Sequence, residues 1–273
     1  MARPDGRLAL IAALSLVLAA CGSGGPPATS TTAGATPTIS ATATPTEPAP
    51  TGPSPLAICH DGAHCAISPG DYVSPAPEGF WPGMTFSIGS GWFATEADRG
   101  ELALHPSAQP NDALLFWKDV VAIRSSTGGS GIGGITAVEG VGTTPEELLG
   151  YFTSNTDYEV LSGPDAATTA GGLTGTVITM TTSDTANFGD PDCPDNPHCS
   201  AFLRDPIHWG TEFFAIGGDE VVRMFLTSFA AEPKPHTLVI ALDAPNQTEL
   251  ERFAAEAKPI IDSVVLPEAF VDN

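Results

Sequence analysis

The chain has 273 residues, of which 15% are charged, and it carries a net charge of −22 at pH 7. This acidic balance argues against nucleic acid and anionic lipid surfaces as partners, because both are bound by clustered Lys or Arg. The length is sufficient for one substantial domain with its own hydrophobic core.

The N-terminus has the pattern of a bacterial lipoprotein signal peptide. Arg3 and Arg7 precede an apolar run over 8–20, which ends in small residues directly before Cys21. The run is shorter than the ~20 residues that a membrane-spanning helix needs. We therefore expect cleavage of residues 1–20 and acylation of Cys21, by chains such as palmitate, at the extracytoplasmic face of the cell membrane. The alternative is an ordinary secretory signal with a chance cysteine.

Residues 21–55 are predicted to be a tether. After the lipidated cysteine they are almost entirely Gly, Ser, Thr, Ala and Pro, with a single charge at Glu47. Such a composition buries too little apolar surface to offset the entropy of ordering, so we expect this stretch to be disordered. Its Ser and Thr residues beside Pro also permit O-glycosylation. Residues 56–273 are then expected to form a single globular domain, with two small domains as the alternative.

Strand-like and helical patterns alternate along that domain. Apolar runs, alternating or continuous, predict strands at 84–88, 101–105, 113–123 with a bend near 118–119, 158–161, 173–182, 211–216, 220–229, 236–242 and 260–266. Thr144, Pro145 and Glu147 predict a helix start with a capping box. Asn246 predicts the cap of a second helix, whose apolar face contains Leu250, Phe253 and Ala257. These elements predict an α+β domain, a largely antiparallel sheet with about two packed helices.

Three segments resemble exported actinobacterial lipoproteins of unknown function. They are GMTFSIGSGW, TAGGLTGTVITM and LERFAAEAKPIIDSVVL. Some of those lipoproteins are similar to the PsbP-like superfamily, which includes mycobacterial lipoproteins of the LpqN type. The resemblance covers residues 82–267 and implies an α/β/α sandwich with a binding or accessory role and no enzymatic activity. The resemblance assigns no functional residue to this chain, because the shared motifs consist of glycines and aromatic residues. The cysteine loops and residues 182–205 are not part of the similar segments.

Four cysteines remain once Cys21 carries lipid. They form two loops of equal spacing, Cys59 to Cys65 and Cys193 to Cys199. In an oxidising, exported setting an even number of cysteines predicts two disulfides. The equal spacing favours the two local pairs, although three pairings satisfy the count.

Histidines in and beside these loops raise the alternative of a metal site. His60 and His64 lie in the first loop and His198 in the second, and Cys and His are the usual ligands of zinc. The spacing differs from the short pairs of structural zinc sites, and an oxidised cysteine does not ligate. A metal-binding protein or metal-dependent enzyme is therefore the alternative, and the main interpretation includes no cofactor.

Three tryptophans are candidates for a ligand groove. Trp92, Trp117 and Trp209 could line it, since aromatic walls bind sugars and lipids, although core positions are the commoner use of tryptophan. A glycine-rich stretch at 129–134 fits the spacing of a nucleotide-binding loop but lacks the helix that would hold a phosphate. The sequence predicts a lipid-anchored, non-enzymatic binding or accessory domain for an envelope protein, a lipid or a small solute.

Overall fold

A computed structural model describes residues 52–59, 64–75, 80–98, 100–125, 135–186, 198–205, 213–229 and 235–267. The chain divides into two units, Met1–Pro48 and Ala49–Asn273, and all described residues belong to the second. The predicted lipidation site Cys21 and the predicted signal peptide therefore lie outside the described residues. The described part is mostly antiparallel strands with two helices, so the predicted α+β class is confirmed.

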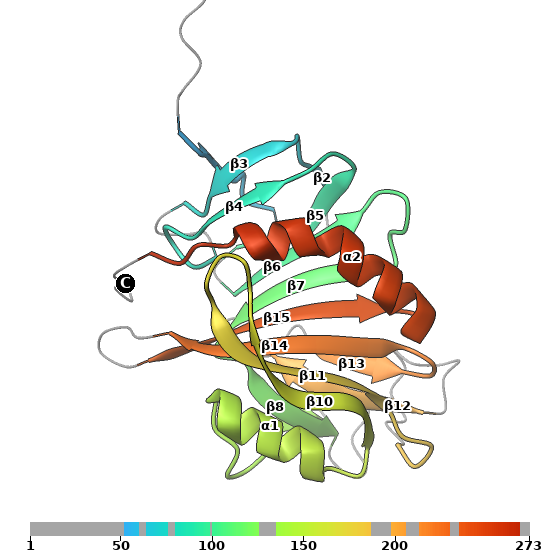
Figure 1. The fold of residues 1–273 in the computed structure, drawn as a ribbon. Helices are drawn as coiled ribbons and strands as arrows, with labels where there is room; N and C mark the ends of the chain where they lie inside the picture. The colour runs from blue at the N-terminus through green and yellow to red at the C-terminus, as the bar shows by residue number, and fades with distance from the viewer. Residues whose placement is uncertain are drawn as a thin grey trace, which may run out of the picture. The chain divides into compact units, whose positions relative to one another are not determined.

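An eight-stranded antiparallel sheet forms the centre of the domain (Figure 1). Its order is β10-β11-β14-β15-β7-β6-β5-β2. The strand bounds are β2 Cys65–Ala66, β5 Trp92–Ala97, β6 Glu101–Pro106, β7 Ala113–Lys118, β10 Tyr158–Thr168, β11 Thr174–Thr182, β14 Val221–Phe229 and β15 His236–Ala244. All 9 residues of β15 are buried, because both faces of the sheet are covered at its middle.

Two smaller sheets and two helices complete the described fold. One sheet has the order β1-β3-β4 and the other β13-β12-β8-β9. Their bounds are β1 Ser54–Pro55, β3 Gly70–Val73, β4 Thr85–Ile88, β8 Val121–Ser125, β9 Ile135–Ala137, β12 Cys199–Arg204 and β13 Phe214–Gly217. Helix α2 (Gln247–Ser263) contacts β15 and β4, whereas α1 (Pro145–Ser154) contacts β10 and β8 (Figure 1).

Period-two alternation along the central strands divides their side chains between two hydrophobic cores. In β7, Leu114 and Phe116 join the core that includes Phe253 of α2. The residues next to them, Leu115 and Trp117, join the core on the other face, which includes the buried side chains of α1 and β12. A shift of one residue in register would exchange these sets, so the two cores together specify the pairing of the sheet.

The predicted strand over 113–123 is divided in the structure by the bend foreseen near 118–119. Asp119 has φ +54°, a left-handed conformation that Asp adopts more readily than most residues. Its carboxylate accepts hydrogen bonds from the backbone N–H of Thr237 at 2.9 Å and from Nδ1 of His236 at 2.5 Å. This anchor lets the chain leave the large sheet after β7 and enter the four-stranded sheet as β8.

Both predicted helix starts are confirmed. Thr144 and Glu147 form the reciprocal capping box of α1, and the Asn246 side chain caps α2. The predicted strand over 260–266 is wrong, because α2 continues to Ser263 and Val265 makes only an isolated bridge to Thr85. The β-branched run favours a strand locally, but burial of Ile260 against the sheet prevails over that preference.

Candidate functional site

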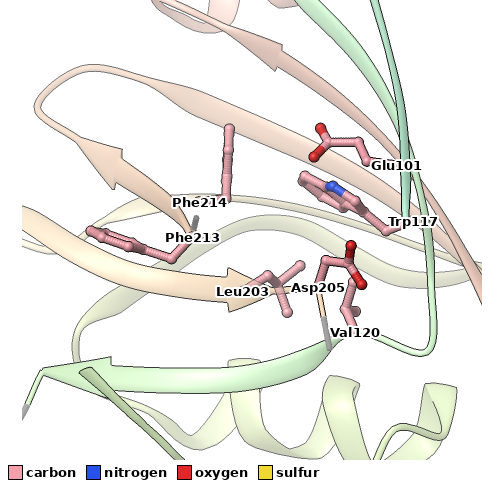
Figure 2. Close-up of a pocket in the computed structure, with 7 residues that line it drawn as sticks. All are labelled: Glu101, Trp117, Val120, Leu203, Asp205, Phe213 and Phe214. Carbon is pink, nitrogen blue, oxygen red and sulfur yellow. The ribbon is translucent and has the colours of Figure 1, made fainter. Parts of the chain in front are cut away.

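A cavity of about 250 Å³ lies where the four-stranded sheet meets β6 and β7 (Figure 2). Seven described residues line it: Glu101, Trp117, Val120, Leu203, Asp205, Phe213 and Phe214. They come from the start of β6, the end of β7, the β7–β8 connection, the end of β12 and the start of β13. The size suits one small solute and not a long chain molecule.

Strand register places the first two of these side chains together. Glu101 in β6 is directly paired with Trp117 in β7, and paired residues of an antiparallel ladder project to the same face. The indole of Trp117 is held by Phe214, whose ring centroid lies 5.4 Å away at an interplanar angle of 60°. In Figure 2 the carboxylates of Glu101 and Asp205 are drawn on opposite sides of this indole. Packing therefore fixes the aromatic wall of the cavity.

The second carboxylate belongs to Asp205, which directly follows β12 and is only 8% exposed. It approaches the backbone just before β6 very closely, because a Cβ atom built on Gly100 would lie 1.6 Å from Asp205 Oδ2. A glycine is therefore required at position 100 if the carboxylate is to keep this place. In the β8–β12 pairing Leu203 is opposite Ala122. This pairing brings Asp205, two residues further on, close to the start of β6 and the end of β7.

The chemistry of the lining is simple. Both charged side chains among the seven are carboxylates, and the others are aromatic or aliphatic apart from the indole N–H of Trp117. Among these seven described residues there is no pair of a nucleophile and a base of the kind that covalent catalysis requires. This arrangement can accept hydrogen bonds and positive charge from a ligand and can pack against its apolar surface.

The three predicted groove tryptophans have different environments. Trp117 lines the cavity. Trp92 is buried under α2, with its ring 6.0 Å from that of Phe253, and it lines neither of the cavities described here. Trp209 lies outside the described residues. The structure thus places one of the three at the candidate site.

The cysteines of the first loop are bonded to each other. Cys59 and Cys65 form a disulfide with an S–S distance of 1.98 Å, which confirms the predicted pair. Cys199 is also disulfide-bonded, whereas Cys193 lies outside the described residues. The sulfurs of Cys59 and Cys65 are therefore not available as the thiolates that zinc binds.

The structure describes two of the three histidines of the predicted metal set. His60 lies outside the described residues. His64 stacks on Phe93 with centroids 4.3 Å apart, and the backbone carbonyl of His198 accepts a hydrogen bond from the N–H of Gly218 at 2.8 Å. Within the part of the chain that the structure describes, no group of three or more His, Cys, Asp or Glu side chains could hold a metal ion.

Two further histidines are occupied in structural contacts. The ring nitrogens of His105 lie 2.9 Å from the Thr95 hydroxyl and 2.9 Å from the backbone carbonyl of Asp112. Burial lowers the pKa of His105, although the backbone hydrogen bonds oppose that change. His236 is held by Asp119, as described above. Neither histidine lines the cavity.

A second hollow, of about 300 Å³, is a groove between α2 and the strands β10, β11, β14 and β15. Its walls are mostly aliphatic, with Val177, Phe225 and Ile240 among them. The charged residues at its rim are already engaged, since Arg223 pairs with Glu251 at 2.6 Å and Lys258 pairs with Asp262. The cavity of Figure 2 is the better candidate because it has polar groups that can orient a small ligand.

Sequence reasoning did not find six of the seven lining residues: Glu101, Val120, Leu203, Asp205, Phe213 and Phe214. Glu101 was placed at the start of a predicted strand, and the two phenylalanines were within another. No local pattern joins Glu101 to Asp205 and the two phenylalanines, which come much later in the chain. Only the pairing of β12 with β8, in a stretch where no strand was predicted, brings Asp205 to the others.

No protein-family model matches the chain, and no curated protein matches it. Among the described helices, none is both long and apolar enough to span a bilayer. The features that point to a function are therefore the cavity itself and the N-terminal sequence pattern.

Proposed function

We propose that this protein is a lipid-anchored, extracytoplasmic binding protein that holds a small solute in the cavity of Figure 2. The observation that carries this proposal is the cavity, in which packed aromatic rings and two carboxylates face a space of about 250 Å³. Such a mixture of apolar walls and a few polar groups is typical of ligand sites. Binding, and not catalysis, is favoured because the seven described lining residues include no nucleophile paired with a base.

The N-terminal sequence supports the location. Cys21 follows a short apolar run and precedes a tether that would hold the domain away from the membrane. The resemblance of three segments to exported lipoproteins supports the same assignment, together with an accessory role in the cell envelope. A disulfide between Cys59 and Cys65 is consistent with an oxidising compartment.

The proposal is tested by asking whether solute retention depends on the cavity. The full chain, purified in detergent, is incubated with the low-molecular-weight fraction of a bacterial envelope extract and then separated by gel filtration. Mass spectrometry identifies solutes that remain bound. In a Val120→Phe variant a larger ring would fill the cavity, whereas Ala254→Leu would fill the groove beside α2 and is the control.

We expect the native chain and Ala254→Leu to retain the same solute and Val120→Phe to lose it. Circular dichroism shows whether each variant is folded. If Val120→Phe does not fold, Phe214→Ala replaces it, because this variant removes an aromatic wall of the cavity instead of adding volume. Retention by a folded cavity variant at the native level would show that the cavity is not the binding site.

A further inference from the structure

We propose that β10, the edge strand of the large sheet, binds a partner protein by pairing with an extended, basic segment of it as an added strand. This inference goes beyond the proposed function, because it assigns a second binding surface and a partner. It does not rest on the cavity of Figure 2, since no residue of β10 lines that cavity. Three properties of β10 carry it: its open hydrogen-bonding edge, its exposure and its charge.

The backbone of β10 has one open edge. β10 is the end strand of the eight-stranded sheet, and it pairs with β11 while no described strand pairs with its other side (Figure 1). Every second residue of such a strand directs its N–H and C=O away from the sheet, where an added strand can bond to them. β10 has 11 residues, about twice the length of a typical strand. At the opposite end of the sheet β2 has 2 residues, too few to pair with an added strand.

β10 is also exposed along most of its length. Only Tyr158 at its start is buried, while Val160 and Ala167 are half-buried and the other residues are exposed. Leu161 is 41% exposed and is one of two large hydrophobic side chains that are exposed in the described part of the chain. This exposure leaves the edge accessible to another polypeptide, and an apolar side chain of that polypeptide can cover Leu161.

Irregularities in β10 restrict where a strand can be added. The register with β11 shifts between Val160 and Ser162 and again between Ser162 and Asp165, and Pro164 has no N–H to donate. Such features protect an edge against indiscriminate pairing. From Asp165 to Thr168 the register is continuous, so this section offers a regular ladder to an added strand.

The charge of β10 decides which partner fits. Its charged residues, Glu159 and Asp165, are both acidic and exposed, and no hydrogen bond or ion pair joins either carboxylate to another described residue. Lys or Arg side chains on the added strand would form favourable cross-strand pairs with them. A second copy of this chain fits less well, because each copy has a net charge of −22. The backbone edge thus provides the site, and the two carboxylates select a basic partner.

The test uses a fluorescent peptide of alternating Lys and Val, with about eight residues so that it can span the edge. Its anisotropy is followed while the full chain in detergent is added. A peptide with methylated backbone nitrogens keeps the charges but cannot donate backbone hydrogen bonds. A third peptide has Glu in place of Lys. Hydrogen exchange with mass spectrometry then shows which amides of the protein the peptide protects.

The variants reverse one charge at a time. Glu159→Lys and Asp165→Lys change β10, and Glu139→Lys makes the same change of charge at an exposed position outside β10. Val120→Phe fills the cavity of Figure 2 and leaves β10 unaltered. Thermal unfolding shows whether each variant is folded, and the two β10 variants test the same edge independently.

We expect the Lys peptide to bind the native chain about tenfold more tightly than either of the other peptides. It should also slow amide exchange within residues 158–168. Glu159→Lys and Asp165→Lys should each weaken its binding about fivefold. Glu139→Lys and Val120→Phe should bind it as the native chain does.

Several results would overturn the inference. No binding of the Lys peptide, equal binding of the methylated peptide, or binding without protection of residues 158–168 would each exclude strand addition at β10. Unchanged affinity in both β10 variants would exclude selection of a basic partner by Glu159 and Asp165. Self-association of the native chain that protects the same residues would make a second copy the occupant. The proposed function is not affected by these results, because solute retention is tested separately with Val120→Phe.

Discussion

The carboxyl groups of Asp243, which is buried, and Glu220, which is half-buried, hydrogen-bond to each other where β14 begins and β15 ends. Burial, followed by the charge of Glu220, raises the pKa of Asp243 well above its ordinary range. Burial also raises the pKa of Glu220, whose Oε2 accepts a hydrogen bond from the backbone N–H of Gly217 at 2.7 Å. The folded protein therefore keeps a proton at this pair that the unfolded chain releases.

A raised carboxyl pKa in the folded state means that this pair favours folding most at low pH. The contribution is complete below the unfolded pKa, near about pH 4, and is lost as the pH rises toward the folded pKa. Asp243→Asn removes this titration. We expect the free energy of unfolding of the native chain, relative to Asp243→Asn, to fall by up to about 1.4 kcal/mol per pH unit above pH 4.

Urea unfolding of both proteins between about pH 4 and pH 8 measures this difference. The control is Glu139→Gln, because Glu139 is exposed and its substitution should leave the difference from the native chain nearly constant. The free energy of unfolding of the native chain minus that of Asp243→Asn should fall with pH. If this difference stays constant or increases with pH, the assignment of a raised pKa to this pair is contradicted.

Arg252 connects helix α2 to the turn that precedes β7. Its guanidinium bonds to the carboxylate of Asp112, to Glu249 at 2.8 Å and to Glu256 at 3.0 Å. Asp112 is only 2% exposed, and burial raises its pKa while the bond from Arg252 opposes that change. The arginine thus compensates the charge of a buried carboxylate on another element. An ordinary surface ion pair joins two exposed groups and contributes less.

We expect Arg252→Met to lower the free energy of unfolding by about 2 kcal/mol, because Asp112 is left buried without its charged partner. The matched control is Lys258→Met on the same helix, which removes an exposed pair with Asp262 and should cost less than about 0.5 kcal/mol. Urea unfolding at pH 7 compares the two variants. If both lose the same free energy of unfolding, Arg252 does not compensate Asp112 as proposed.

Elements with strong local signals could be predicted from the sequence. The capping box at Thr144 and the cap at Asn246 are short-range patterns, and both helices begin where these residues indicate. The C-terminal part of α2 was missed because Pro259 and the residues after it locally favour an end to the helix. Burial of Ile260 against distant strands decides its conformation, and periodicity does not reveal such a contact.

The candidate site was predicted only in part for a related reason. Trp117 stood out as an aromatic residue in an apolar run, so it could be proposed for a ligand groove. Asp205 could not, because it follows β12, which lies within residues 182–205, where no strand was predicted and which the resemblance excludes. The site depends on pairing between β8 and β12, and the alternation of a single strand does not identify its partner.

At the scale of the whole molecule, the proposed anchor depends on one sulfur atom. We expect Cys21→Ser to move the protein from the membrane fraction to the soluble extracytoplasmic fraction, since serine lacks the thiol that would carry the lipid. Fractionation and intact mass of the full chain, expressed in a bacterium that processes lipoproteins, check this. Ser23→Ala is the control. If Cys21→Ser remains in the membrane fraction at the native level, the anchor is not at this cysteine.

The position of β15 affects when the domain can fold. Among the described strands β15 is the last to be synthesised, yet it lies between β14 and β7, which end at Phe229 and Lys118. Until β15 emerges, the two halves of the large sheet cannot join and both hydrophobic cores are incomplete, so no early part of the chain is expected to fold stably ahead of the rest. If the chain is exported unfolded through a membrane channel, as the proposed location requires, this late closure is an advantage, because it delays folding until nearly the whole chain has passed.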